Sequence, residues 1–152
     1  KDKKYIFSIF NRSLSWRRRF WLLPSRKKVK IVKSRFGNDY YNDLRSSEIA
    51  INIHYSHKNL DDFESGIFEA MASGCLVISE RLNDKTLIDL DMENAIIQIE
   101  SPFDLNKKLQ SLEKKPDTIK NYQQEAKQAI CKNTWHDRAN IMKHKFQEIC
   151  EK

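Results

Sequence analysis

Residues 63–79, FESGIFEAMASGCLVIS, contain the pattern that decides the fold. Phe63 to Ser73 predicts a helix, and Gly74 is placed to end it, because glycine readily adopts the left-handed conformation found after many helices. Cys75 to Ser79 then forms a short, nearly continuous apolar run, which is typical of a strand buried on both faces. A helix that leads directly into such a strand indicates a βαβ arrangement and a parallel sheet.

The same alternation extends in both directions from this segment. Four further apolar runs predict strands at residues 5–10, 29–32, 49–53 and 95–99, and helices are expected at 14–23, 36–47 and from 101 onward. A loop with one helical turn is expected at 82–93. We therefore expect an α/β fold: a Rossmann-like, doubly wound parallel sheet of about five strands, with helices on both faces and a C-terminal helical tail. Residues 1–152 are short enough to form one such domain.

Composition excludes several classes of protein. The chain is 39% hydrophobic and 11% aromatic, which is too apolar for a disordered chain. No apolar run approaches the ~20 residues of a membrane span, and no signal peptide is visible. Cys75, Cys131 and Cys150 are far apart and lack metal-site spacing. They indicate free thiols in a reducing cytoplasm.

Positive charge is concentrated at the N-terminal end. Residues 1–35 hold 13 of the 28 Lys and Arg residues and one of the 21 acids, a balance of +12, whereas residues 36–152 carry −5. Such a field attracts phosphates, nucleic acid or anionic lipid. A solvated face, or an interface with a missing partner domain, is an equally open interpretation.

The predicted helix at 14–23 has an apolar stripe formed by Trp16, Phe20 and Leu23, with the arginines at 17–19 mostly off it. We expect this stripe to pack on the sheet, because the helix has to cover one sheet face. A basic amphipathic helix at a membrane surface, formed by Trp16, Phe20 and Trp21 beside the arginines at 17–19, is the alternative. Trp135 is expected to be a core anchor, and His54 a polar loop histidine.

Candidate binding residues follow the predicted strands, where ligands bind in open α/β sheets. Four loops qualify, at residues 11–13, 33–37, 54–66 and 80–84. The first two are basic and the third is acidic. Cations beside a helix N-terminus suit a phosphate, and carboxylates accept hydrogen bonds from hydroxyl groups. Gly66 would let a phosphate approach the backbone, and Glu69 lies in an otherwise apolar helix, so we expect it to be partly buried. The pattern predicts a nucleotide or nucleotide-sugar site.

The stretch from Asp61 to Ser79 resembles the donor-binding signature of retaining GT-B glycosyltransferases. That signature places an acid before a glycine-containing turn, followed by Glu-Ala-Met-Ala-x-Gly and a strand, and here Glu69 to Gly74 match its second part. The wider chain resembles the group 1 glycosyltransferase subgroup related to spore-maturation CgeB-type proteins. Residues 11–19, 47–54 and 134–139 carry this wider likeness.

The resemblance implies a hexosyltransferase-type enzyme of polysaccharide or glycoconjugate biosynthesis. Its predicted catalytic residues are Glu69, which would bind the ribose hydroxyls, Asp61, which would contact the donor sugar, and Arg12, which would neutralise the departing diphosphate. The segment 33–36 would hold the base. The implied donor-binding set is Asn11, Arg12, Lys33, Arg35, Phe36, Asp62, Phe63, Glu64, Ser65, Gly66, Ile67 and Glu69. Two residues depart from the signature: Asp61 stands for the usual glutamate, and Glu64 adds negative charge beside the diphosphate.

The resemblance further implies that the chain is the C-terminal half of a two-domain enzyme, consistent with a start at Lys1. The expected partners are a nucleoside-diphosphate sugar, an acceptor glycan, lipid or protein, and the missing N-terminal domain. No metal and no permanently bound cofactor are required by the sequence. We expect the protein in the cytoplasm or at the cytoplasmic membrane face. A non-catalytic α/β interaction domain and a basic nucleic-acid-binding module are the alternatives; for nucleic acid, no stacking platform or recognition motif is visible.

Overall fold

The computed structural model describes residues 5–10, 15–32, 36–55 and 63–150, and for residues 5–10 it describes the backbone. Strands and helices alternate along the first two-thirds of the chain, and helices follow. In order, the elements are β1 (Tyr5–Phe10), α1 (Trp16–Leu22), η1 (Leu23–Ser25), β2 (Val29–Val32), α2 (Gly37–Arg45), β3 (Ser47–Asn52), α3 (Ser65–Ala72), β4 (Leu76–Glu80), α4 (Asp84–Asp89), β5 (Ile96–Ile99), α5 (Pro102–Glu113), α6 (Pro116–Cys131) and α7 (Trp135–Cys150).

The five strands form one parallel sheet in the order β2-β1-β3-β4-β5. Each strand pairs in parallel with its neighbours; Ile51 of β3, for example, pairs with Ile9 of β1 and Ile78 of β4. Strand order reverses between β1 and β3, so the carboxyl ends of these two strands mark the topological switch point. The predicted doubly wound α/β fold is confirmed.

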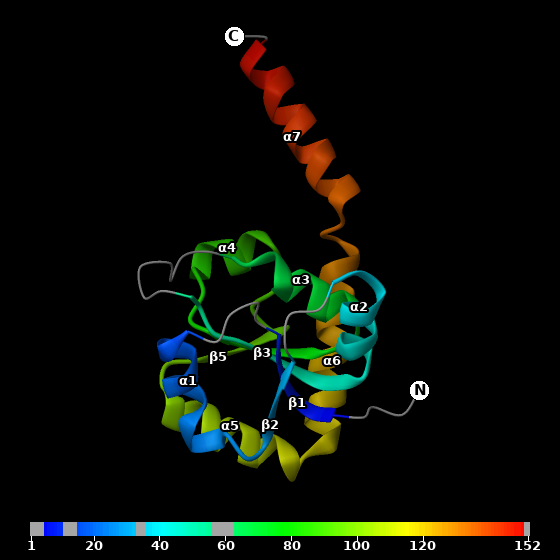
Figure 1. The fold of residues 1–152 in the computed structure, drawn as a ribbon. Helices are drawn as coiled ribbons and strands as arrows, with labels where there is room; N and C mark the ends of the chain where they lie inside the picture. Colours follow the sequence, from blue (N-terminus) through cyan, green and yellow to red (C-terminus); the bar gives the residue numbers. More distant parts are fainter. Residues whose placement is uncertain (1–4, 11–14, 33–35, 56–62, 151–152) are drawn as a thin grey trace.

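Helices cover both faces of the sheet (Figure 1). On one face, α1, η1 and α5 pack over a cluster that includes Trp21, Ile51 and Leu105. On the other face, α2, α3 and α4 pack over a second cluster that includes Leu44 and Met71. Helix α6 contributes to both clusters, with Ile119 and Tyr122 in the first and Ala126 and Ala129 in the second. It therefore joins the two layers.

Local chemistry sets where the helices begin and end. Side chains of Ser15, Asn83 and Ser101 cap α1, α4 and α5 by accepting hydrogen bonds from backbone N–H groups. Helix α3 ends before Gly74, whose φ of 81° few other residues tolerate. This turn directs the chain from α3 straight into β4, as the sequence predicts.

Helix α1 packs with the face opposite to the one expected. Trp16, Phe20 and Leu23 are 80%, 57% and 64% exposed, and the buried residues of α1 are Arg18, Trp21 and Leu22. The prediction that the stripe packs on the sheet is therefore wrong. The physical reason lies at the carboxyl ends of the neighbouring strands, where carbonyl groups and a buried carboxylate are satisfied by arginine side chains.

Helix α7 extends away from the rest of the domain (Figure 1). None of its residues is buried, and Trp135 at its start is 87% exposed, so the prediction of a core anchor is wrong. The sheet faces are already covered by the preceding helices. Near the start of α7, the Arg138 guanidinium lies 5.9 Å from the centre of the Phe68 ring on α3. The predicted helical tail is confirmed. Within the described ranges, the search for a helix long and apolar enough to cross a membrane found none.

Candidate nucleotide-sugar site

Three described structural elements meet near the switch point. They are the N-terminal end of α1, the chain leaving β3 at Ile53 and His54, and the N-terminal end of α3; the end of β4 lies directly beside them. Of the predicted site residues, the structure describes Phe36, Phe63, Glu64, Ser65, Gly66, Ile67 and Glu69. The others lie outside the described residues: Asn11, Arg12, Lys33, Arg35, Asp61 and Asp62.

The N-terminus of α3 is not capped by the side chain of its N-cap residue. Glu64 occupies the N-cap position, but its carboxylate makes no capping hydrogen bond. Ser65 is exposed, and a Cβ atom built on Gly66 would meet no atom within 4 Å. Ile67 on the next position is buried and fixes the helix against the core. The first N–H groups of a helix lack intrahelical partners and carry partial positive charge, so this open end can accept an anion.

Arg17 of α1 forms a forked ion pair with Glu80 at the end of β4. The Arg17 Nη1 atom also donates to the carbonyl oxygen of His54 at 2.9 Å. The carboxylate of Glu80 in turn accepts a hydrogen bond from the backbone N–H of His54 at 3.2 Å. One buried ion pair thus fixes both polar backbone groups of the residue that follows β3.

Arg18 lies deeper and joins the same region to α3. Its Nε atom donates to the carbonyl oxygen of Ile53 at 2.8 Å, and its Nη2 atom lies 3.8 Å from the Glu64 carboxylate. Its guanidinium also lies 5.5 Å from the ring centre of Tyr55. Burial lowers the pKa of Arg18 from its ordinary value, and the charge of Glu64 opposes that shift. Arg18 therefore connects the end of β3 to the N-cap of α3.

His54 is fully buried, so the prediction of a polar loop histidine is wrong. Its Nε2 atom lies 3.1 Å from the carbonyl oxygen of Arg81, and its Nδ1 atom lies 3.5 Å from Oε1 of Glu64. Burial acts to lower the pKa of His54, but the Glu64 carboxylate, the Arg81 carbonyl and the charge of Glu80 outweigh it and raise the pKa above the ordinary value. The negative charge of Glu64 therefore faces two groups that offset it, His54 and Arg18.

Glu69 is half-buried on α3, as expected, and it has a partner within the protein. The Tyr40 hydroxyl of α2 donates a hydrogen bond to its carboxylate. Burial, followed by this contact with Glu69, raises the pKa of Tyr40 above its ordinary value. The tyrosine fixes the carboxylate, which has four lone-pair positions and can accept further hydrogen bonds from ligand hydroxyls.

Sequence reasoning missed Arg17, Arg18 and Tyr40 as members of this region, and it identified no partner for His54 or Glu80. A signal existed for Glu80, an acid that directly follows an apolar strand. The residue pattern of α1 did not identify Arg17 and Arg18 as site residues, because their partners lie at the ends of β3 and β4 and at the start of α3. Phe36, which was predicted near the base, lies at the N-cap of α2 and is 70% exposed.

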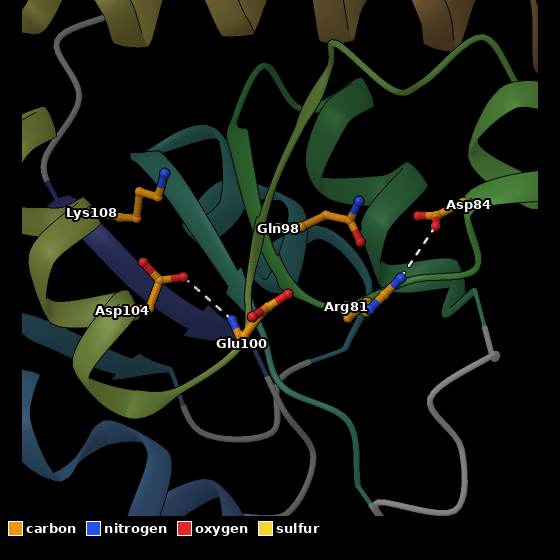
Figure 2. A pocket seen from close by; sticks show the side chains of 6 residues that line it. All are labelled: Arg81, Asp84, Gln98, Glu100, Asp104 and Lys108. Atoms are coloured by element: carbon orange, nitrogen blue, oxygen red, sulfur yellow. Dashed lines mark hydrogen bonds and ion pairs between the residues drawn. The ribbon is translucent and has the colours of Figure 1, made fainter.

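A separate polar depression of about 320 Å³ lies at the ends of β4 and β5. Figure 2 shows its lining residues, which are Arg81, Asp84, Gln98, Glu100, Asp104 and Lys108. Arg81 pairs with Asp84, and Asp104 accepts a hydrogen bond from the backbone N–H of Glu100. Because several of its groups are paired internally and it lies away from the switch point, we do not assign the donor to it. The described residues contain no group of three or more His, Cys, Asp or Glu side chains placed to hold a metal ion.

A family model described as glycosyl transferase-like matches residues 3–144. This chain belongs to the glycosyl transferase-like family. The match spans β1 to α7, so it covers every element that forms the candidate site. A comparison with curated proteins gave no match.

Among solved structures, this family member is similar to sucrose-phosphate synthase from Thermosynechococcus elongatus. The TM-score is 0.62 at 17% sequence identity, over 89% of this chain. The likeness establishes the Rossmann-like GT-B fold that the sequence predicts. It covers 34% of the synthase, so this chain spans about a third of that protein's length.

Proposed function

We propose that this chain binds a nucleoside-diphosphate sugar at the N-terminus of α3 and takes part in transfer of the sugar to an acceptor hydroxyl. The observation that carries the proposal is the start of α3, which the Glu64 side chain does not cap and where no described atom lies within 4 Å of a Cβ built on Gly66, beside the switch point of a glycosyl transferase-like domain. Oriented N–H groups and the helix dipole suit a diphosphate.

The neighbouring side chains fit the rest of such a donor. Glu69, held by Tyr40, would accept hydrogen bonds from the ribose hydroxyls. Glu64 would repel the diphosphate if its charge were isolated, but Arg18 and His54 lie against it. In this proposal Asp61 contacts the donor sugar, and Arg12 stabilises the charge that develops on the departing diphosphate.

The proposal includes a second domain that supplies the acceptor glycan, lipid or protein, since GT-B enzymes bind their substrates between two domains. It further assigns the chain to the CgeB-type subgroup and to hexosyl transfer in the cytoplasm for polysaccharide or glycoconjugate synthesis. No metal or permanently bound cofactor takes part, because arginine side chains and a helix N-terminus can together neutralise a diphosphate.

The test is a thermal-shift and calorimetric panel of UDP, GDP, ADP and CMP with their sugar conjugates. A donor at ~100 times its Kd adds about 2.7 kcal/mol to apparent stability. That corresponds to a rise in Tm of several degrees for a chain of this size. Glu69→Ala should abolish the shift, and Glu125→Ala, at an exposed position on α6, is the matched control.

Gly66→Ala separates binding from folding. The added methyl group meets open space in the protein, so it should leave the fold intact and raise stability by about 0.5–1 kcal/mol, as alanine does in a helix. The same methyl group should block the diphosphate and remove the ligand shift. A ligand shift that survives both Gly66→Ala and Glu69→Ala would place the donor elsewhere. No shift with any nucleotide, for this chain and for the chain joined to a second domain, would favour the non-catalytic interaction domain.

A further inference from the structure

The outward face of α1 and the turn after it combine exposed apolar and cationic side chains. We define the α1 outer face as Trp16, Arg19, Phe20, Leu23, Arg26 and Lys27, all of which are exposed. Trp16, Phe20 and Leu23 are spaced four and three residues apart, so they lie on one side of the helix, and Arg19 lies on the same side. In Figure 1, α1 lies at the outside of its layer beside α5.

These apolar side chains are not needed to complete the core. Trp21, Leu22 and Val29 are buried on the inward side of this segment, in the cluster that α5 also joins. Arg17 and Arg18 fix the inward side of α1 through Glu80 and the carbonyl of Ile53. The helix is therefore anchored by one face, while a Trp, a Phe and a Leu remain together in solvent. Adjacent exposed side chains of this size mark a surface that binds something.

The charge around this face indicates what it binds. Residues 3–38 contain no Asp or Glu, so this segment contributes cations and no acid to the α1 outer face. Glu113 of the neighbouring α5 pairs with Lys28, which is not part of that face. Protein interfaces are enriched in Trp, Phe and Arg, but they are depleted of Lys and their cores are depleted of charge. The clustered cations, rather than the aromatic residues, therefore distinguish a lipid surface from a protein partner. Interfacial helices at anionic bilayers combine aromatic and aliphatic side chains with Lys and Arg. The chemistry favours a lipid surface over a protein partner.

We propose that the α1 outer face docks this domain on the surface of an anionic lipid bilayer. Trp16, Phe20 and Leu23 enter the headgroup region, and Arg19, Arg26 and Lys27 lie against lipid phosphates. The N-terminal end of α1 lies at the carboxyl edge of the sheet, so docking brings the candidate site close to the membrane. This inference goes beyond the proposed donor site and does not depend on it.

Vesicle flotation with the 152-residue chain tests the proposal. The chain should float with vesicles of phosphatidylcholine and phosphatidylglycerol and remain in solution with phosphatidylcholine alone. Binding should fall steeply between 0.1 M and 1 M salt, over which the screening length drops from about 10 Å to about 3 Å. Binding to both vesicles alike, or to neither, overturns the proposal.

Two variants with matched controls identify the face. Trp16→Ala/Phe20→Ala/Leu23→Ala should weaken binding at least about tenfold. Trp135→Ala/Phe146→Ala/Ile149→Ala, which removes an exposed Trp, Phe and Ile from α7, should leave binding unchanged. Arg26→Glu/Lys27→Glu should also weaken vesicle binding at least about tenfold. Lys120→Glu/Lys127→Glu on α6, which makes the same change of charge, should weaken vesicle binding much less. All altered residues are exposed, so the melting temperature should change little.

The outcomes that contradict the proposal are specific. Loss of binding in the α7 variant, with α1 variants that bind normally, would assign the membrane contact to α7. A dimer that light scattering detects without lipid, and that only the α1 triple variant dissociates, would assign the α1 outer face to a second copy of the chain. Either result overturns the lipid assignment.

Discussion

Helices α1 and α5 lie on the same face of the sheet (Figure 1). Helix α1 buries an arginine beside two apolar residues, whereas α5 buries leucine residues alone. Helix α5 buries Leu105, Leu109 and Leu112, which recur at helical spacing, and its polar residues face outward. Helix α1 buries Arg18 and half-buries Arg17, and it exposes Phe20 together with other apolar residues. The two helices thus show that apolar periodicity predicts the buried face of one and the exposed face of the other.

The difference follows from what each helix meets. Helix α5 packs on the apolar flank of β5 and its neighbours, where leucine side chains fill the available space. The beginning of α1 meets the carboxyl ends of β3 and β4, where two backbone carbonyl groups and the carboxylate of Glu80 are removed from water. Buried acceptors of this kind require donors, so Arg18 is buried there and Trp16 and Phe20 are not, whereas Trp21 is buried in the apolar cluster.

The largest expected effect comes from breaking the buried ion pair of α1. Arg17→Met leaves Glu80 buried and unpaired, and we expect it to lower the free energy of unfolding by about 3–5 kcal/mol. The double variant Arg17→Met/Glu80→Met removes both charges and should recover much of that loss. Urea unfolding of the three proteins measures both values. A cost near zero for Arg17→Met would show that the ion pair does not hold α1 to the sheet.

The next largest effect is the difference in stability loss between two leucine-to-alanine substitutions in this layer, at Leu109 and at Leu23. Leu109→Ala on α5 removes a fully buried side chain and should cost about 2–5 kcal/mol. Leu23→Ala, after α1, removes a side chain that is 64% exposed and should change stability by about 0.5 kcal/mol or less. The same urea titration compares them. Equal costs would contradict the inverted packing of α1.

The smallest effect is a pH dependence that arises at His54. Its pKa in the folded protein lies above the ordinary value of 6.5, because the carboxylates of Glu64 and Glu80 face it, although Arg17 and Arg18 are also near. A raised folded-state pKa means that the stabilisation is fully present below pH ~6.5 and is lost as pH rises through the folded pKa. We expect unfolding free energy to fall over that window.

Glu64→Gln tests the origin of this dependence. It removes the charge nearest to the His54 ring, so the fall in stability with rising pH should become shallower, and the His54 pKa measured by NMR should decrease. Glu125→Gln, at an exposed position on α6, should leave both values unchanged. A rise in the His54 pKa in Glu64→Gln would reverse the sign and contradict the assignment.

The sequence by itself determined the fold class and most of its elements. Short apolar runs predict β1, β2, β3, β4 and β5 because doubly buried strands need apolar residues on both sides, and the glycine at 74 predicts the turn into β4. The motif around Glu69 also placed Gly66 and Glu64 at the start of one helix. These signals are local, so a single segment of chain contains all the information they need.

Tertiary structure alone decided which side of α1 faces inward and which residues surround the candidate site. Arg17, Arg18, His54, Glu64 and Glu80 come from four separate elements that the sheet order brings together. Whether an arginine or a tryptophan is buried depends on the atoms of the neighbouring elements that it contacts. The residue pattern within one helix does not identify those atoms. The buried acceptors beside β3 and β4 place Arg18 on the inward side of α1 and leave Trp16 and Phe20 on the surface.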